Sequence, residues 1–387
     1  MQQIYLDNNS TTTIDPAVAE TMAECLAAGF VNPASQHQMG QAARRALEDS
    51  RTAILQLIGA TPTSMEADQL IFTSGGTESN NLGLLGLSHQ PDGSLPECRR
   101  VLVSSIEHPS ISVAADLLQQ QGWTVERIRV DSDGVIYLDH LDELLDQPAR
   151  LVSVMAANNE TGVIQPVAQI AERCQKAKAL FHCDAVQALG KIPLDFYDVG
   201  CDAMTITAHK LHGPRGIGAL VLRNGLTPFP AFFGGFQQQG IRPGTEDVCL
   251  ARGFSKAVEL AVSDLKKRAR HMRTLRDRLQ KELCEKCTGV TVNGGDADRT
   301  PHTLNLSFSG INRQEFLLAA DMNGLAVSTG SACASGSSDP SPVLLAMGLG
   351  SDVVEGSIRI SFSARSTPVE MIRASDCIVN LVNNLRR

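Results

Sequence analysis

The chain has 387 residues, which is too long for one typical domain and long enough to bury a large core. Hydrophobic residues make up 43% and charged residues 20%, and the net charge of −8 argues against a nucleic-acid-binding or anionic-membrane surface. The N-terminus lacks the features of a signal peptide, and no apolar run approaches the roughly 20 residues that span a bilayer. We therefore expect two domains and a cytoplasmic location.

The ten cysteines are scattered, unlike the dense framework of a small secreted disulfide domain. We expect most of them to be reduced and several to be buried as small apolar residues. Cys284 and Cys287 form the only close pair, but no second pair or histidine cluster accompanies them. No metal site is predicted, and the sequence leaves open whether this pair has a role.

Short β-rich runs alternate with helical patterns between about residues 70 and 222, for example the helix spacing of Val167–Ala177. This alternation predicts an α/β fold with a mostly parallel sheet covered on both faces. Ligands of such sheets bind outside the carboxyl ends of the strands. The predicted strands are residues 70–72, 101–103, 125–130, 151–155, 180–183, 203–207 and 218–222.

A long charged helix is predicted next, from about residue 253 to 284. Its second half, DLKKRARHMRTLRDRLQKEL, has the composition of a solvent-facing connector. Beyond it, residues 303–308 and 358–362 are predicted strands with helices between and after them, which indicates a smaller α+β domain. Residues 328–339, rich in Ser, Gly and Ala, form the only low-complexity segment.

The first predicted strand is followed by TSGGTESN, which leads into helix-compatible sequence. Gly76 would let the backbone approach an anion closely, a helix start offers N–H groups, and Thr77 adds a hydroxyl. The segment has neither the lysine of a Walker motif nor the spacing of a dinucleotide fingerprint. It predicts a phosphate site, although a glycine-rich turn with a helix cap would also explain it.

Polar residues follow several later strands. His108 follows the second and Asn159 the fourth, and each alone is also compatible with an ordinary polar residue or turn. Asp184 ends the fifth, where a carboxylate is costly to bury without a positive partner such as a protonated pyridine nitrogen. A helix N-cap is the alternative for Asp184. Gln187, three residues on, could reach a substituent of the same ring.

Lys210 follows the sixth strand, at an edge of the sheet where a surface lysine is not expected. Lysine forms Schiff bases with carbonyl cofactors, and burial can lower its pKa for proton transfer. About one strand–crossover–strand unit separates Asp184 from Lys210, so the two can occupy neighbouring strand ends. A phosphate site, a buried acid and this lysine are the three anchors that pyridoxal phosphate requires, and together they predict this cofactor.

The motifs along the chain resemble those of cysteine desulfurases, the NifS/IscS-like members of the class V aminotransferase family. The match extends over nearly the whole chain and is most specific at STGSAC, which ends at Cys333. The loop from Cys333 to Pro342 is long, as in the long-loop branch of that family. Other matching motifs are YLDNNSTT, NPAS, GGTESN, EH at Glu107, NNETG, DAVQ, TAHKLHGPRGIG, IRPGTEDV, AMGL and GSIRISF.

The resemblance implies a homodimer with the fold-type I (aspartate aminotransferase-like) architecture of pyridoxal-phosphate enzymes. Residues 15–261 would form the large cofactor-binding domain around a seven-stranded sheet. Residues 1–14 and 262–387 would form the small domain, which carries the catalytic-cysteine loop at about 328–342. The implied reaction removes sulfur from L-cysteine, giving L-alanine and a persulfide that passes to an acceptor such as an iron–sulfur scaffold protein.

The resemblance also implies a role for each matching residue. Lys210 would bind the cofactor aldehyde and shuttle the substrate proton, and Cys333 would be the nucleophile that carries the persulfide. His108 would stack on the cofactor ring and, by hypothesis, assist deprotonation of Cys333. Asp184 and Gln187 would contact the ring, and Asn159 would contact both the cofactor and, together with Arg359, the substrate. The phosphate would be bound by Gly76, Thr77, Thr207, His209 and, from the partner subunit, Thr245.

Alternatives stay open at this point. Composition and spacing do not separate Cys333 from an ordinary loop thiol. The same scaffold also suits a selenocysteine lyase, a cysteine sulfinate desulfinase or an aminotransferase, and a non-catalytic sulfur-transfer scaffold is a further rival. Cys333 in its long loop favours desulfuration, and the intact anchor set around Lys210 favours an enzyme. The sequence identifies neither the sulfur acceptor nor whether Cys333 transiently ligates a transferred cluster.

Overall fold

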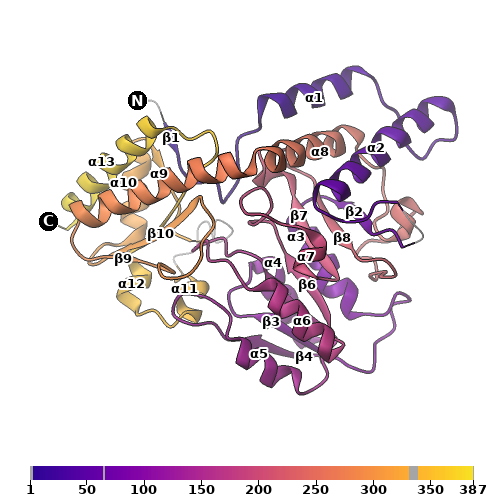
Figure 1. The fold of residues 1–387 in the computed structure, drawn as a ribbon, viewed down its shortest axis with the longest axis horizontal. Coiled ribbons are helices and arrows are strands. Elements are labelled where there is room, and N and C mark those ends of the chain that lie inside the picture. The colour runs from indigo at the N-terminus through magenta and orange to yellow at the C-terminus, as the bar shows by residue number, and fades with distance from the viewer. Residues whose placement is uncertain (1–2, 64–65, 331–338, 387) are drawn as a thin grey trace.

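The computed structural model describes residues 3–63, 66–330 and 339–386. A seven-stranded sheet organises one half of the molecule and a three-stranded sheet the other, and α8 (Val248–Ser263) and α9 (Leu265–Lys286) run from one half to the other (Figure 1). Within the described ranges, no helix is long and apolar enough to cross a membrane.

The seven-stranded sheet has the strand order β2-β8-β7-β6-β5-β3-β4. Its neighbours pair in parallel except at β8, which is antiparallel to both β2 and β7. All residues of β5, β7 and β8 are buried, which explains why these strands are near-continuous apolar runs. The predicted fold class is confirmed, with strands β2 (Gln69–Thr73), β3 (Arg100–Ser104), β4 (Thr124–Ile128), β5 (Leu151–Met155), β6 (Leu180–Asp184), β7 (Ala203–Thr207) and β8 (Gly218–Leu222).

Helices cover this sheet, and α1 and α2 pack against α8 beside it (Figure 1). Local signals fix several helix starts: Asp15 caps α1, and Pro16 occupies its first turn. The segment after β2 lies unusually close to the sheet, because a Cβ added at Gly83 would meet the His182 ring at 2.7 Å. The helices are α1 (Pro16–Ala27), α2 (Gln38–Leu57), α3 (Gly76–Asn81) continuing into a π-helix (Leu82–Gly86), α4 (Pro109–Gln120), α5 (Leu138–Leu145), α6 (Val167–Ala177) and α7 (Phe196–Val199), with 3₁₀ turns at Ala208–Lys210 and Gln237–Gly240.

The second half is built on an antiparallel sheet of order β12-β10-β9, and a short parallel pair joins β1 to β11. A separate cluster of buried apolar side chains from β10, β12, α9 and α13 forms its core. Thr367 and Glu370 make a reciprocal capping box at the start of α13. The elements are β1 (Ile4–Tyr5), β9 (Val290–Val292), β10 (Thr303–Phe308), α10 (Arg313–Met322), β11 (Leu325–Ala326), α11 (Pro342–Ala346), α12 (Ser351–Glu355), β12 (Ser357–Ser361) and α13 (Pro368–Leu385).

The long charged helix is the main departure from the sequence prediction. We expected one helix from about residue 253 to 284, but α8 ends at Ser263 and α9 begins at Leu265, because Asp264 leaves the helical conformation (φ −111°, ψ 22°). Aspartate competes with the backbone for hydrogen bonds and favours helix ends over helix interiors. Val343 and Leu344 of α11 pack with the core of the large sheet. The division at residues 15–261 stays a proposal.

Candidate active site

A cavity of about 240 Å³ opens at the carboxyl ends of β5, β6 and β7. The N-terminal segment beyond β1 and strand β12 supply its remaining wall, through Asn9, Ser10 and Arg359. The structure thus brings most of the predicted site residues together. Those that line the cavity are Gly76, Thr77, His108, Asn159, Asp184, Gln187, Thr207, His209, Lys210 and Arg359.

Asp184 is buried at the end of β6. One carboxylate oxygen, Oδ2, accepts a hydrogen bond from Asn80 Nδ2 (2.7 Å), and Oδ1 accepts one from the Val186 N–H (3.0 Å). Turns rather than a helix follow Asp184, so it is not the helix cap that the sequence left as an alternative. Its carboxylate is fixed in place and borders the cavity.

Lys210 lies in the 3₁₀ turn that follows β7, so Asp184 and Lys210 follow neighbouring strands as predicted. Its Nζ donates to the carbonyl oxygens of Asn9 and Ser10, the latter at 2.7 Å. The backbone oxygen of Lys210 accepts a hydrogen bond from the buried Lys191 Nζ (2.7 Å). Burial, with the charges of Arg268 and Lys210, lowers the pKa of Lys191 to about 7. A second lysine therefore supports the turn.

Neutral donors surround the glycine-rich segment. Gly76 and Thr77 form the first turn of α3, where N–H groups have no partner within the helix. The Thr207 hydroxyl donates to the Ile217 carbonyl (3.1 Å). His209 Nδ1 lies 3.2 Å from the Thr11 hydroxyl, and burial, with the charges of Lys210 and Arg215, lowers the pKa of His209 to about 4. N–H groups, hydroxyls and a neutral imidazole suit an anionic group.

His108 caps α4 with its ring. Nδ1 accepts a hydrogen bond from the Ser110 N–H (3.1 Å) and lies 2.8 Å from the Ser110 hydroxyl. Burial lowers the pKa of His108 and Lys210 adds to this effect, whereas Asp184 opposes it. Because Nδ1 is an acceptor, the neutral ring carries its proton on Nε2. In this tautomer His108 is a donor, so assisting deprotonation of Cys333 would require a change of tautomer.

Glu107 is a further buried acid beside the site. Its Oε1 accepts hydrogen bonds from the Ser104 hydroxyl (2.6 Å) and the Met155 N–H (2.8 Å). Burial raises the pKa of Glu107 to about 8; Asp184 contributes to the rise, and the Ser104 hydrogen bond opposes it. Near neutral pH this side chain therefore holds a proton for much of the time. In the sequence analysis Glu107 had no role beyond its place in a motif.

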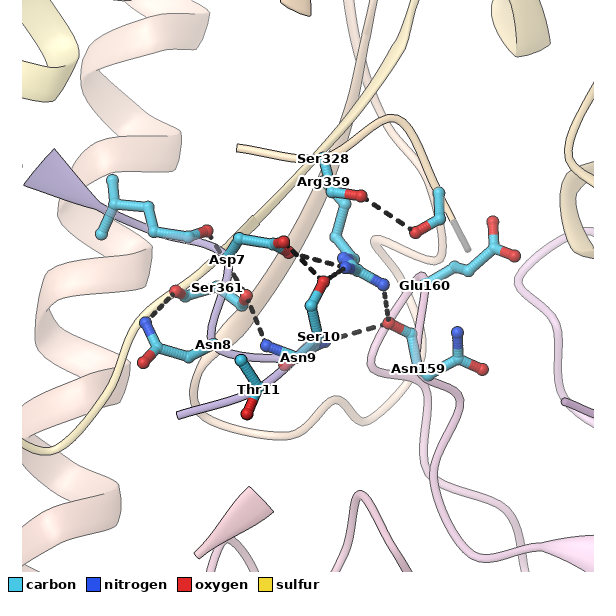
Figure 2. Close-up of polar contacts among 12 residues, drawn as sticks. Asp7, Asn8, Asn9, Ser10, Thr11, Asn159, Glu160, Ser328, Arg359 and Ser361 are labelled. Atoms are coloured by element: carbon cyan, nitrogen blue, oxygen red, sulfur yellow. Dashed lines mark hydrogen bonds and ion pairs between the residues drawn. The ribbon is translucent and has the colours of Figure 1, made fainter. Parts of the chain in front are cut away.

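Arg359 forms the opposite wall, with a side chain that is only 1% exposed. Its Nη2 donates to Asp7 Oδ1 (2.7 Å) and to the Ser10 hydroxyl (3.0 Å), and its Nη1 donates to the Asn159 carbonyl (3.1 Å) (Figure 2). The buried Nε has no hydrogen-bond partner among the described residues. The guanidinium is thus held in one orientation and keeps a donor for a ligand.

The structure places in the site several residues to which we assigned no individual role from the sequence. Asn9 Nδ2 donates to the Asn159 carbonyl (3.0 Å) and to the Thr303 hydroxyl (2.9 Å), and Asn80 holds Asp184. Asn9 and Asn80 both lie within motifs that match the family, and this membership could have marked them as candidate site residues. Their partners lie far away in the sequence, so spacing alone could not assign their contacts.

The remaining predicted site residues are Cys333 and Thr245. Cys333 lies outside the described residues. Thr245 is exposed and borders a different hollow, together with Phe232 and Phe233. Cys284 is exposed and Cys287 is buried, and the described part of the chain contains no group of three or more His, Cys, Asp or Glu side chains that could hold a metal ion.

Comparisons with family models, with curated proteins and with solved structures agree on one family. The aminotransferase class-V model matches residues 4–373. A cysteine desulfurase of Nostoc sp. is 39% identical over 387 residues, covering 100% of this chain and 94% of that protein. One of Klebsiella pneumoniae is also 39% identical, over 386 residues, with the same coverage. The X-ray structure of a NifS-like protein from Rickettsia africae matches with a TM-score of 0.89 and 32% identity, covering 99% of this chain and 100% of that chain.

Proposed function

The chain belongs to the aminotransferase class-V family and is a cysteine desulfurase, and we propose that it uses pyridoxal 5'-phosphate bound by Lys210 and passes sulfur through Cys333. The observation that carries the cofactor assignment is the pairing of Asp184 and Lys210 in one cavity, at the ends of neighbouring strands. A buried carboxylate beside a lysine amine is the arrangement that this cofactor needs.

The residues around the cavity fit the cofactor in charge and in hydrogen-bonding capacity. Asp184, oriented by Asn80, would face the ring nitrogen, and Gln187 would contact the ring oxygen. The phosphate would take the donors of Gly76, Thr77 and His209, and the Thr207 hydroxyl would join them by turning away from the Ile217 carbonyl. Bound there, pyridoxal phosphate would supply an aldehyde for the substrate amine and an electron sink for the charge left on its α-carbon.

The chain's own residues would then bind the substrate and move its proton. Arg359 and Asn159 would hold the α-carboxylate, with Arg359 already oriented by Asp7. The Lys210 amine would take the α-proton and later return a proton to carbon, which is general acid–base catalysis by one group. His108, with its proton on Nε2, would offer a donor beside the ring.

Sulfur transfer would take place on Cys333. Its thiolate would attack the substrate sulfur, forming a new S–S bond while the bond between that sulfur and the β-carbon breaks. The electron pair of the broken bond stays with the departing carbon fragment, which takes up a proton and is released as alanine. The persulfide left on Cys333 would pass to an acceptor protein, for which we propose an iron–sulfur scaffold.

We also propose that the enzyme is a homodimer in which Thr245 reaches the phosphate site of the partner subunit. Thr245 borders a hollow with Phe232 and Phe233 and lies outside the cavity of its own chain. These two phenylalanines and the neighbouring Phe236, which is 95% exposed, present large apolar side chains on the same segment. Exposed apolar clusters of this kind are typical of protein interfaces.

A Cys333→Ala variant tests the proposed chemistry, with Cys284→Ala as the control because Cys284 is an exposed thiol on α9. We expect Cys333→Ala to keep the visible absorbance of the bound cofactor but to lose nearly all release of alanine and sulfide from L-cysteine. Cys284→Ala should retain both. Full activity in Cys333→Ala would rule out the persulfide route.

A further inference from the structure

Lys191 is a buried basic residue that the proposed chemistry does not use. It is only 5% exposed and is not among the residues that line the cavity. Its Nζ donates to the backbone oxygen of Lys210 at 2.7 Å. Within the described ranges, no carboxylate forms an ion pair with this amine. Lys191 therefore contacts the residue proposed to bind the cofactor, and it does so from outside the cavity.

The backbone before Lys191 brings it next to the turn that carries Lys210. Gly190 has a φ of +69°, in the left-handed region that favours glycine. A Cβ added at Gly190 would come within 2.7 Å of the Ala261 side chain on α8 and within 2.8 Å of the Leu211 side chain. The chain thus passes too close to both residues for any side chain at position 190, and this close approach places Lys191 beside the turn.

The turn itself is short. Lys210 ends the three-residue 3₁₀ turn Ala208–Lys210. The Ala208 carbonyl accepts hydrogen bonds from the Leu211 N–H (2.9 Å) and the Gly213 N–H (3.0 Å). The Lys210 carbonyl points to the Lys191 amine instead. A buried carbonyl that loses its donor is costly, so without Lys191 the peptide group after Lys210 should rotate toward another partner and change the direction of the Lys210 side chain.

The ionisable groups around Lys191 are bases. Burial lowers the pKa of Lys191 to about 7, and the charges of Arg268 and Lys210 add to this effect. Burial also lowers the pKa of His212 to about 4 and that of His302 well below its usual range, and in both cases the charge of Lys191 contributes. A buried amine without a carboxylate partner costs free energy that an apolar side chain of the same length would not. The bond to Lys210, rather than packing, accounts for a lysine here.

We propose that Lys191 is a positioning residue for proton transfer: by holding the Lys210 carbonyl it fixes the backbone of the turn and thereby aims the Lys210 amine at the α-carbon of the substrate. This inference rests on the proposed role of Lys210. Reacting groups must be held within a narrow range of distance and direction, and a displacement of about 1 Å can cost on the order of a hundredfold in rate.

The test compares Lys191→Met, Lys191→Gln and Lys191→Arg in the full-length, cofactor-loaded enzyme. Methionine keeps most of the length without a donor, glutamine keeps N–H donors without the charge, and arginine keeps both. Lys281→Met is the matched control, because the Lys281 side chain on α9 is 75% exposed.

The main readout is the rate at which the α-hydrogen of L-alanine exchanges with deuterium oxide, per bound cofactor. In the proposed chemistry this exchange needs the Lys210 amine but not Cys333, so it isolates proton transfer from sulfur transfer. Cofactor absorbance gives the occupancy of each variant. The denaturant midpoint of each variant measures its stability separately.

We expect Lys191→Met to lower the exchange rate per bound cofactor by roughly tenfold to a hundredfold while the visible absorbance of the cofactor persists. The KM for cysteine should stay near the wild-type value, because the bonds that orient Arg359 are unchanged. Lys191→Arg should recover most of the rate and Lys191→Gln only part of it, since glutamine is shorter. Lys281→Met should match the wild type.

Two results would overturn the inference. One is a wild-type exchange rate per bound cofactor in Lys191→Met, which would assign Lys191 to stability or cofactor retention alone. The other is an equal loss in Lys191→Met and Lys191→Arg, which would assign the effect to packing. If Lys191→Met does not fold, a faster exchange in Lys191→Arg than in Lys191→Gln supports the inference and equal rates contradict it. If Lys210→Ala retains the absorbance of lysine-bound cofactor, the proposed function fails, independently of the Lys191 result.

Discussion

The two walls of the cavity are assembled in different ways. On the sheet side, Asp184 and Lys210 follow adjacent parallel strands, and the repeating strand–helix pattern brings them together. On the other side, Arg359 is held by Asp7 and Asn159, which lie 352 and 200 positions away in the sequence. The sheet side is thus a product of regular architecture, whereas the other side depends on three distant segments meeting.

Because of this difference, substitutions in the two walls should impair different steps of the reaction. Beneath the sheet side, His182 is bonded within the sheet, to Ser153 and Thr205 on the two neighbouring strands (both 2.9 Å). Lys210 itself crosses the cavity, since its Nζ donates to the Asn9 and Ser10 carbonyls. Changes on the sheet side should affect cofactor binding first. The opposite wall relies on single side chains that join separate segments, so changes there should affect substrate binding and sulfur transfer while the cofactor stays bound.

The largest expected effect is on the sheet side, in Lys210→Ala. Without the amine, we expect the visible absorbance of lysine-bound cofactor to disappear and alanine formation to fall by at least about a thousandfold, because one group supplies both attachment and proton transfer. Absorbance spectra and an alanine assay measure the two effects. Lys176→Ala, which changes an exposed lysine on α6, should alter neither. A retained absorbance band in Lys210→Ala would mean that another lysine binds the cofactor.

A smaller and different effect is expected across the cavity, in Arg359→Lys. Lysine keeps the charge but has a single nitrogen in place of the planar fork that reaches Asp7 and Asn159 through two, so we expect kcat/KM for cysteine to fall by roughly tenfold to a hundredfold, mainly through KM. Cofactor absorbance should be unchanged. Arg365→Lys is the control, because Arg365 is exposed and donates to the Ile14 carbonyl outside the cavity. Loss of cofactor from Arg359→Lys would show that the two walls do not act separately.

The same contrast between the two walls explains which site residues could be predicted from the sequence pattern alone. Asp184 and Lys210 were predictable without any relative, because strand-end positions in a parallel sheet follow from periodicity and from connection length. Arg359 was predicted only through family resemblance, since nothing in a local pattern indicates that a residue of β12 meets Asp7. The bonds that Asn9 and Asn80 make also join positions far apart in the sequence, so no local pattern indicated them.

Local backbone conformation and local hydrogen bonds also limited what could be predicted from the sequence. The break between α8 and α9 depends on one residue, Asp264, within a sequence whose composition suits a helix throughout. The orientation of His108 depends on the Ser110 N–H, and this bond determines which ring nitrogen carries the proton. The sequence permits the backbone conformation of Asp264 and the Ser110 hydrogen bond but specifies neither, so both features required the folded structure.

The smallest expected effect concerns Glu107, which tests whether the sheet side is supported by a neutral acid. With a pKa of about 8 when folded and about 4.5 when unfolded, Glu107 keeps its proton longer in the folded state, so its contribution to stability is complete below about pH 4.5 and is lost as pH rises to about 8. Glu107→Gln cannot ionise and can still accept from Ser104 and Met155. Denaturant midpoints measured across this range should therefore shift in favour of Glu107→Gln as pH rises, and by less than the effects above. Glu97→Gln, at an exposed position, should follow the wild type. Parallel curves for wild type and Glu107→Gln would show that Glu107 is already ionised in the folded protein, and that a second negative charge lies beside Asp184.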